Sequence, residues 1–389
     1  MNSKFIPYGR QDIDDEDINN VVKVLKSDFI TQGPTVPLFE NLLSKYTHGK
    51  YSFCLNSATS ALHLACLSLG LKKGDIVWTS PISFVASANC ALYCGAKVDF
   101  IDIDPFSYNM SVKKLEEKLI NAKKEGDLPK IVIPVHLSGQ SAEMIKIKEL
   151  SKEFNFKIIE DASHALGGSY KNEKIGSCKF SDLTVFSMHP VKMITTGEGG
   201  VITTNNKLIA KKIKSLRSHG ITKDTLDMTK VPDGLWYYEQ LELGYNYRMP
   251  DINAALGITQ LDKLDKFVSK REEIANYYDK NLIDLPLKTP HQIPNCVSSR
   301  HLYIIRIDNK HSKFKHKDIF SRLRDSNIGV NLHYIPIHLQ PYFQNLGFIK
   351  GQFPEAEKYY EEAISLPIFT KLTKREQDYV IDTLRKLII

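Results

Sequence analysis

Two short apolar segments of this sequence, residues 156–159 and 183–186, each run into polar residues that could do chemistry. Asp161 follows the first segment and Lys192 follows the second. If the segments are neighbouring strands of an open α/β sheet, their carboxyl ends meet where such sheets bind ligands. A lysine amine can form a Schiff base with an aldehyde, and a carboxylate can keep a ring nitrogen protonated. Either residue alone is commonly structural, but the pair is typical of sites for pyridoxal phosphate (PLP).

A second stretch could bind an anion. Residues 56–60 read Asn-Ser-Ala-Thr-Ser and precede an apolar run at 61–69 that ends at Gly70. This pattern predicts a helix whose first N–H groups are free to meet a phosphate, because the start of a helix carries partial positive charge. The alternative is a plain helix cap made by a serine or threonine hydroxyl.

A sheet is needed to bring these residues together, and the first 216 residues predict one. Short apolar segments alternate there with longer amphipathic ones. Strands are predicted at 76–78, 98–101, 131–135, 156–159, 183–186 and 201–204, and helices at 81–94, 112–122, 142–154 and 208–216. Such alternation is typical of the α/β class, with a mostly parallel sheet covered by helices on both faces. The strand at 201–204 is the one that could run antiparallel.

The rest of the chain predicts a second, smaller domain. Apolar residues at helical spacing predict one long helix from residue 250 or 251 to residue 278. Strands are then predicted at 302–307 and 330–334, and helices at 317–324, 354–363 and 374–386. We therefore expect a large domain over 1–249, with an N-terminal arm, and a small α+β domain over 250–389 that includes the linking helix. Residues 218–247 lack clear periodicity, and a connection of that length is expected to be functional or interfacial.

Composition excludes several classes of protein. The 389 residues carry a net charge of +7, from 52 Lys and Arg against 45 Asp and Glu. This mild, evenly spread charge suits an anionic substrate, and we expect no nucleic-acid partner. The sequence has no apolar run of membrane-spanning length and no signal-peptide core, so we expect no membrane association. Six cysteines without Cys-x-x-Cys spacing are typical of reduced thiols, which favours a cytoplasmic protein without a metal site.

Several distant motifs, in the right order, are similar to one family. The chain resembles the DegT/DnrJ/EryC1/StrS sugar aminotransferases, which have the aspartate aminotransferase fold (fold type I of the PLP-dependent transferases). The similar segments span nearly the whole chain and lie at residues 29–33, 56–62, 81–86, 160–167, 186–192, 244–249, 333–338 and 353–357. The resemblance implies PLP as cofactor.

The resemblance also implies roles around the PLP ring. Lys192 would be the Schiff-base lysine and the carrier of the transferred proton, and Asp161 would hold the pyridinium N–H. Phe84 would stack on the ring face. His164 would contact the ring oxygen, at a position where the family more often has Gln.

The phosphate of the cofactor would be bound by Ser187 and by the N–H groups of Ala58 and Thr59. The family usually has Gly at position 58, and Ala tolerates positive φ less well, so we expect a slightly rearranged turn there. Asn246 is similar to the residue that reaches the phosphate from the neighbouring subunit. The resemblance therefore implies a homodimer with shared active sites.

Within the family, residues 56–62, 81–86 and 217–221 are most similar to enzymes of pseudaminic acid biosynthesis. Those enzymes aminate C4 of a UDP-4-keto-6-deoxy-N-acetylhexosamine with L-glutamate as amino donor. The resemblance places the UDP-linked sugar against Tyr8, Asp28, Phe29, Ile30, Thr31, Asn331, Leu332, His333, Tyr334 and His338. The residue for the glutamate carboxylate is not identified.

Three alternatives stay open. The first is a related C4 aminotransferase of legionaminic or bacillosamine type, or a C3 aminotransferase, on a UDP-, dTDP- or GDP-keto sugar. The second is a sugar dehydratase of the same fold, although such relatives carry His where this chain has Lys192. The third is a non-catalytic sensor of PLP or of a sugar nucleotide.

Overall fold

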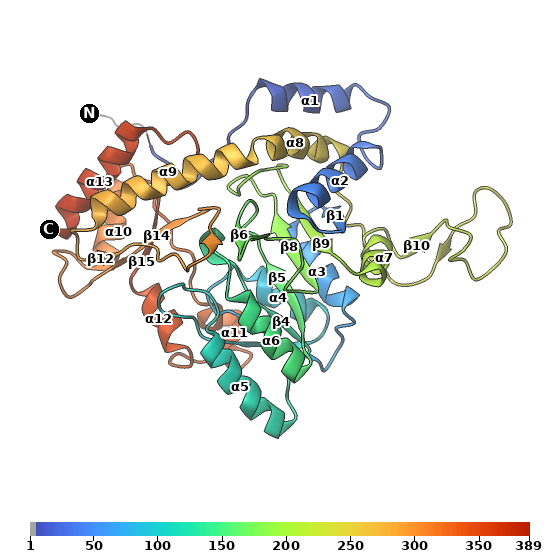
Figure 1. The fold of residues 1–389 in the computed structure, drawn as a ribbon, viewed down its shortest axis with the longest axis horizontal. Coiled ribbons are helices and arrows are strands. Elements are labelled where there is room, and N and C mark those ends of the chain that lie inside the picture. The colour runs from blue at the N-terminus through green and yellow to red at the C-terminus, as the bar shows by residue number, and fades with distance from the viewer. Residues whose placement is uncertain (1–4) are drawn as a thin grey trace.

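A seven-stranded sheet forms the centre of the computed structural model, which describes residues 5–389 (Figure 1). Its strand order is β1-β9-β8-β5-β4-β2-β3. All neighbours pair in parallel except β9, which runs antiparallel to both β1 and β8. The strands are β1 (Tyr51–Leu55), β2 (Ile76–Thr79), β3 (Lys97–Phe100), β4 (Ile131–Ile133), β5 (Lys157–Asp161), β8 (Leu183–Ser187) and β9 (Gly200–Thr204). The predicted α/β class is confirmed, including the antiparallel strand after residue 200.

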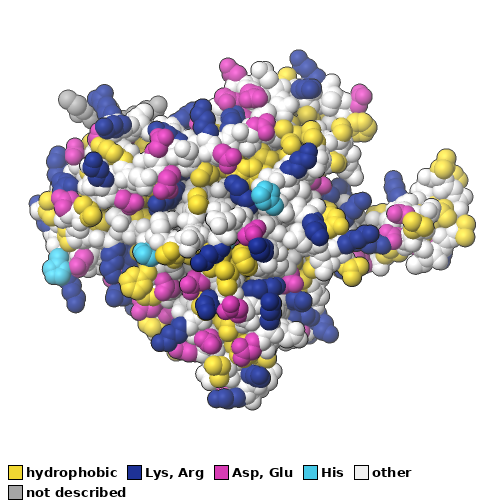
Figure 2. Space-filling model, viewed as in Figure 1, with side chains coloured by type: hydrophobic (Ala, Val, Ile, Leu, Met, Phe, Trp, Pro, Cys, Tyr) yellow, Lys and Arg dark blue, Asp and Glu magenta, His cyan; other side chains and the backbone are white. Residues whose placement is uncertain are grey.

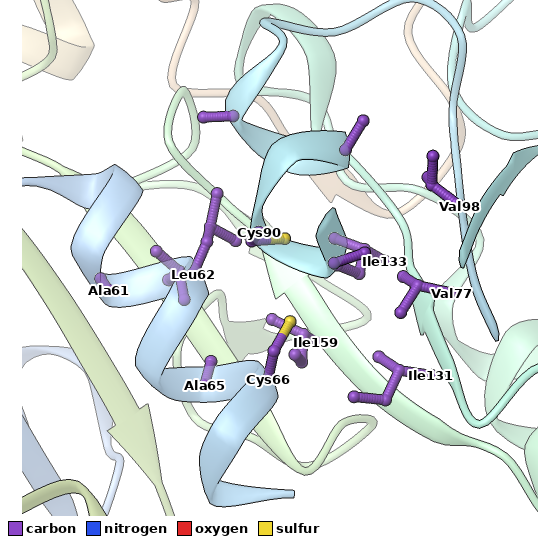
Figure 3. Packing of buried hydrophobic residues seen from close by; sticks show 14 of the residues in the cluster. Ala61, Leu62, Ala65, Cys66, Val77, Cys90, Val98, Ile131, Ile133 and Ile159 are labelled. Atoms are coloured by element: carbon purple, nitrogen blue, oxygen red, sulfur yellow. The ribbon is translucent and has the colours of Figure 1, made fainter. Parts of the chain in front are cut away.

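Helices cover both faces of this sheet because successive side chains of a buried strand point to opposite faces. Ile131 and Ile133 of β4 pack beneath α3 (Ala58–Ser68) and α4 (Ala86–Tyr93), as Figure 3 shows. Val132 packs on the other face, in a cluster with residues of α5 (Val112–Glu125) and α6 (Met144–Phe154). Helix α7 (Lys207–Leu216) completes the first layer. The middle positions of β4, β5 and β8 are therefore mostly apolar, since both faces of these strands are covered.

The second part of the chain forms a smaller sheet with its own apolar core. Strands β12 (Leu287–Lys288), β14 (Tyr303–Ile307) and β15 (Ala363–Leu366) pair antiparallel. They are covered by α10 (His316–Asp325) and α13 (Lys374–Ile388). The buried residues of α11 (Pro341–Gln344) and α12 (Pro354–Tyr360) belong to the same cluster as those of α3 and α4. Ile6, from the N-terminal arm, belongs to this core and forms a backbone bridge with Ile328. The predicted division at residues 249 and 250 stays a prediction.

Four helices lie along one side of the molecule, where these parts meet. Helix α1 (Asp15–Leu25) and α2 (Thr35–Thr47) both pack on α8 (Asp251–Asp262), and α9 (Leu264–Leu282) packs on α13. The predicted single helix from 250 to 278 was wrong, because it breaks between α8 and α9. At the break, the N–H of Lys263 donates to the carbonyl of Gln260 in a tight turn, and its ammonium pairs with buried Asp17. Within residues 5–389, no helix combines the length and apolar character needed to cross a membrane.

Three other sequence predictions need correction. Residues 330–334 are extended but join a neighbour only through the bridge between Asn331 and Ser365, so they form no strand. The helix predicted to begin at residue 81 starts at Ala86, after a series of bends. The helix predicted for 354–363 ends at Tyr360, and β15, which the pattern did not predict, follows it.

Residues 218–247 form an arm that projects from the body of the protein (Figure 1). Strands β10 (Ile221–Thr222) and β11 (Glu239–Gln240) pair at its base. The Glu239 carboxylate shapes the loop between them, since it accepts hydrogen bonds from the N–H groups of Thr229 and Lys230. Apolar side chains stand in solvent along the arm (Figure 2), among them Leu226, Val231, Leu235 and Trp236. Another small sheet is formed by β6 (Ser169–Tyr170), β7 (Glu173–Lys174) and β13 (Cys296–Val297).

Asp102 ties the end of β3 to the start of α12. Its carboxylate is buried and accepts hydrogen bonds from the N–H groups of Glu355 and Ala356, at 3.0 and 2.9 Å. We expect Asp102→Ala to lower the free energy of unfolding by about 1–3 kcal/mol, because it leaves the free N–H groups of a helix start without an acceptor.

Urea unfolding of the purified protein measures this loss. Glu117→Ala is the matched control, since it removes a carboxylate whose partner Lys114 is exposed. That change should alter the free energy by no more than about 0.5 kcal/mol. Equal unfolding midpoints for the two variants would contradict the role of Asp102.

Candidate active site

A cavity of about 500 Å³ opens beyond the carboxyl ends of β5 and β8. These strands are neighbours in the sheet, so the residues that follow them arrive at the same edge. Twelve of the residues predicted from the sequence line this cavity. They are Tyr8, Ala58, Thr59, Phe84, Asp161, His164, Ser187, Lys192, Asn331, Leu332, His333 and Tyr334.

Lys192 lies on the loop after β8, where a tight turn fixes it: its N–H donates to the carbonyl of His189 at 2.9 Å. Met193 and Ile194, which follow, are buried and anchor the loop. Burial lowers the pKa of the Lys192 amine to about 8, and the negative charge of Asp161 partly offsets this effect. A larger share of the amine is therefore neutral near pH 7 than in an exposed lysine.

Asp161 is the last residue of β5 and is held on both oxygens. Oδ2 accepts a hydrogen bond from the hydroxyl of Ser87 at 2.6 Å. Oδ1 accepts from the hydroxyl of Ser163 at 2.6 Å and from its N–H at 3.1 Å. The Ser87 hydroxyl also lies 2.7 Å from that of Ser83. These hydrogen bonds fix the buried carboxylate in one orientation, as a partner for a cationic ring nitrogen requires.

His164 is a neutral hydrogen-bonding group. Burial lowers its pKa well below the ordinary value, and the charges of Lys192 and His333 add to the effect. Its Nδ1 accepts from the N–H of Ser138 at 3.3 Å, so in the neutral ring Nε2 carries the proton. Nε2 lies 3.1 Å from the hydroxyl of Tyr334 and can donate to it. The Tyr334 hydroxyl then has its own proton to donate, at the wall of the cavity.

The start of α3 supplies the anion-binding end of the cavity. Ser57 caps this helix by accepting a hydrogen bond from the N–H of Ser60 at 3.1 Å. The N–H groups of Ala58 and Thr59 are left without helical partners, beside Ser187. The turn can lie this close to β9 only because position 200 is Gly: an added Cβ would come within 2.3 Å of the Ser57 carbonyl oxygen.

Ala58 needs no rearranged turn, which corrects the sequence prediction. The residue is the first of α3 and has no positive φ. Alanine suits that helical position as well as glycine does. Phe84 is 58% exposed and lines the cavity, and its stacking on the PLP ring stays a prediction.

Several residues of this site were not predicted from the sequence. Ser87 and Ser163 hold Asp161, and Ser87 lies three residues after Phe84, a helical spacing that could have revealed it. His301 lines the cavity with its ring centroid 4.4 Å from that of His164. Burial lowers the pKa of His301 well below its ordinary value. No local pattern in the sequence connects residue 301 with residue 164.

His338 was wrongly predicted to line the sugar site. It is fully buried in another part of the fold, where its Nε2 lies 2.9 Å from a carboxylate oxygen of Glu357. Its ring packs against Phe353 at a centroid distance of 4.7 Å. The chain turns away from the cavity after Tyr334, so the side chain is a structural partner of α12.

Five other predicted site residues do not line the cavity of their own chain, so a single chain does not bring them to the site. They are Asp28, Phe29, Ile30, Thr31 and Asn246. All five residues are exposed. Two contacts keep their segments together: the N–H of Asp251 donates to the carbonyl of Ile30, and the Asp251 carboxylate accepts from the N–H of Gly33.

The lining fits PLP. The cavity offers a buried amine for the aldehyde, a fixed carboxylate for the ring nitrogen, an aromatic face for the ring and a helix start for the phosphate. Among residues 5–389, no group of His, Cys, Asp or Glu side chains is arranged to hold a metal ion.

Comparison with known proteins agrees with this geometry. Residues 11–385 match the DegT/DnrJ/EryC1/StrS aminotransferase family. Over 381 residues, the chain is 43% identical to UDP-4-amino-4,6-dideoxy-N-acetyl-beta-L-altrosamine transaminase of Campylobacter jejuni, covering 97% of this chain and 96% of that protein.

Two solved structures share the whole fold. Helicobacter pylori PseC, an aminotransferase involved in the biosynthesis of pseudoaminic acid, has a TM-score of 0.90 and 34% identity over 99% of each chain. A putative sugar aminotransferase of Streptococcus pneumoniae, in its PMP form, has a TM-score of 0.89 and 33% identity over 98% of each chain. The chain therefore belongs to the DegT/DnrJ/EryC1/StrS aminotransferase family and is a PLP-dependent aminotransferase.

Proposed function

We propose that this enzyme aminates C4 of a UDP-4-keto-6-deoxy-N-acetylhexosamine, with L-glutamate as amino donor, in pseudaminic acid biosynthesis. The observation that carries the aminotransferase chemistry is the placement of Lys192 and Asp161 in one cavity. The substrate rests on the relatives: the C. jejuni protein is named for a UDP-linked 4-amino sugar, and the H. pylori protein for pseudoaminic acid. Both similarities extend over nearly the full length of this chain.

The residues of this chain supply binding, orientation and proton transfer. When bound, PLP supplies an aldehyde that takes up an amine and a ring that stores the electron pair left by a departing proton. Lys192, with its lowered pKa, can accept a proton near neutral pH and return it to a neighbouring carbon. Asp161, fixed by Ser87 and Ser163, keeps its negative charge where the ring nitrogen needs it.

The sugar nucleotide would enter over the segment 331–334 and Tyr8. His333 is buried, and its Nδ1 lies 2.8 Å from the hydroxyl of Ser365, which fixes the ring. Burial lowers the pKa of His333 to about 3, with a further contribution from the charge of Lys192. A ring that stays neutral offers hydrogen bonds to sugar hydroxyls without attracting a second anion.

The rate at which PLP is captured should report the Lys192 amine, because only its neutral form attacks an aldehyde. We expect the rate of PLP capture by cofactor-free enzyme to rise with pH through a midpoint of about 8. In Asp161→Asn the midpoint should fall, because the lost negative charge no longer stabilises the ammonium form.

Stopped-flow absorbance of the coloured product measures this rate across the neutral and alkaline range. Lys192→Ala is the control and should show no such phase. A midpoint at the ordinary lysine value of 10.5 would contradict the effect of burial.

The substrate is tested with purified enzyme, L-glutamate and a panel of keto sugars. The panel holds the UDP-linked 4-keto-6-deoxy-N-acetylhexosamine, its 3-keto isomer, and dTDP- and GDP-linked 4-keto sugars. We expect mass spectrometry to show amination of the first substrate, and NMR to place the amine on C4. Lys192→Ala should lower turnover at least ~10²-fold, since it removes the general base. If the enzyme prefers another sugar of the panel, that sugar replaces the proposed substrate. If it aminates none of them, the result favours a non-catalytic sensor.

We further propose that the enzyme is a homodimer with shared active sites. Asn246 and residues 28–31 are exposed and lie outside the cavity of their own chain, which supports a role for both in the partner's cavity. Apolar side chains stand exposed at helical spacing on α1, namely Ile18, Val22 and Leu25. Phe29, Ile30 and Leu38 continue this apolar surface, and a second copy of the chain would cover it.

Mixed dimers test the shared site. Lys192→Ala and Asn246→Ala should each be poorly active alone. After the two are unfolded and refolded together, about a quarter of wild-type activity should return, since half of random dimers are hybrids with one unaltered site. If each site is built within one chain, mixing restores nothing, because every site then carries one of the two changes.

A further inference from the structure

Three thiols and an imidazole meet where α3 packs against α4, at the ends of these helices that lie away from the PLP cavity. His63 and Cys66 lie three residues apart on α3. Cys90 lies on α4, and Cys94 caps its end. Figure 3 shows Cys66 and Cys90 on facing helices, above the isoleucines of the sheet. The proposed aminotransferase chemistry uses none of these four side chains.

Cys94 differs from the other cysteines in its surroundings. It is partly exposed, whereas Cys66 and Cys90 are buried. The neighbouring Cys66 thiol, together with His63, outweighs burial and lowers the pKa of Cys94 to about 6. Burial, and then the charge of Cys94, raises the pKa of Tyr245.

His63 is oriented by aromatic neighbours. Its Nδ1 lies 3.3 Å from the hydroxyl of Tyr247, and its ring contacts Tyr93 and Tyr245 at centroid distances of 5.6 and 5.0 Å. Its other nitrogen, Nε2, is buried and has no hydrogen-bond partner within residues 5–389. A buried polar atom without a hydrogen-bond partner destabilises the fold, and Nε2 of His63 could donate a hydrogen bond to a neighbouring thiolate.

Cys66 has the opposite character. The neighbouring thiols of Cys90 and Cys94, and then burial, raise its pKa well above the ordinary value, so it stays a neutral thiol. An accessible thiolate beside a protonated thiol is the arrangement in which a peroxide oxidises the first and the second closes a disulfide. Cys296 offers a contrast, because it is also partly exposed but burial raises its pKa.

We propose that Cys94 is a redox modification site at which hydrogen peroxide is reduced and a disulfide with Cys66 is formed. The Cys94 thiolate attacks one oxygen of hydrogen peroxide, the O–O bond breaks, and the leaving hydroxide takes up a proton to give water. Cys94 is then a sulfenic acid. The sulfur of Cys66 attacks it, the S–O bond breaks, and the proton of Cys66 leaves with the oxygen as a second water. Two thiols are oxidised and one molecule of hydrogen peroxide is reduced.

The two cysteines bridged by this bond lie on helices that also reach the cofactor. Helix α3 begins with Ala58 and Thr59 at the phosphate end of the cavity, and Ser87 of α4 holds Asp161. The modification site therefore lies on the same two helices as the cofactor contacts, at their opposite ends.

Alkylation of the wild-type holoenzyme tests the first part without any variant. The holoenzyme is treated at pH 7 with a limiting amount of iodoacetamide, and the alkylated cysteines are identified by peptide mapping. Cys94 should react at least about fourfold faster than Cys296, because its larger thiolate fraction outweighs the lower nucleophilicity of a thiolate with a lower pKa. His63→Gln should slow Cys94 and leave Cys296 unchanged. Equal rates for Cys94 and Cys296 would overturn the proposal.

Oxidation tests the second part. After treatment with a small excess of hydrogen peroxide, non-reducing peptide mapping should find a link between the peptides of Cys66 and Cys94. Dimedone, added during oxidation of Cys66→Ser, should label Cys94 as the trapped sulfenic acid. Cys90→Ser is the matched control and should still form the link. Two outcomes would contradict the proposed site. One is a disulfide between Cys66 and Cys90 in place of the one with Cys94, and the other is the absence of any disulfide together with no dimedone label on Cys94.

Discussion

The site depends on the balance between burial of the Lys192 amine and the negative charge of Asp161. Burial favours the neutral amine, and Asp161 favours the charged one, so the pKa falls only to about 8. The balance needs the two side chains at a fixed separation, and adjacent parallel strands provide it, because β5 and β8 end at the same edge. Ser87 and Ser163 then prevent the carboxylate from turning toward the amine and neutralising it in a tight pair.

The polar residues around this pair are arranged so that few of them carry charge. His164, His301 and His333 all have pKa values lowered by burial, and the charge of Lys192 contributes to each. The cavity thus combines one titratable amine with three neutral imidazoles, and Asp161 and Glu198 are carboxylates in its lining. Under the proposed function, the phosphate of PLP would be bound at the start of α3 and the sugar nucleotide at the segment 331–334, so the two anions would not compete for one cation.

Much of this could be predicted from the sequence, for physical reasons. Parallel strands covered on both faces form short, mostly apolar runs, so β5 and β8 were recognisable, and with them the meeting of Asp161 and Lys192. Features set by distant partners were not recognisable. His338 follows the site segment closely in sequence, but its partner Glu357 is on another helix. The break at Lys263 depends on Asp17, far away in the chain. Asn246 and residues 28–31 are exposed and lie outside the cavity of their own chain, a position that no local pattern in the sequence reports.

The N-terminal arm gives the protein a particular order of assembly. The N–H of Ile6 donates to the carbonyl of Asn327, and the carbonyl of Tyr8 accepts from the N–H of Ile368. Tyr8 belongs to the wall of the cavity. During synthesis on the ribosome, Ile6 and Tyr8 must therefore wait for residues 327 and 368 before they find their place. The central sheet can form while translation continues, but the wall of the cavity at Tyr8 is closed only after residue 368 has emerged.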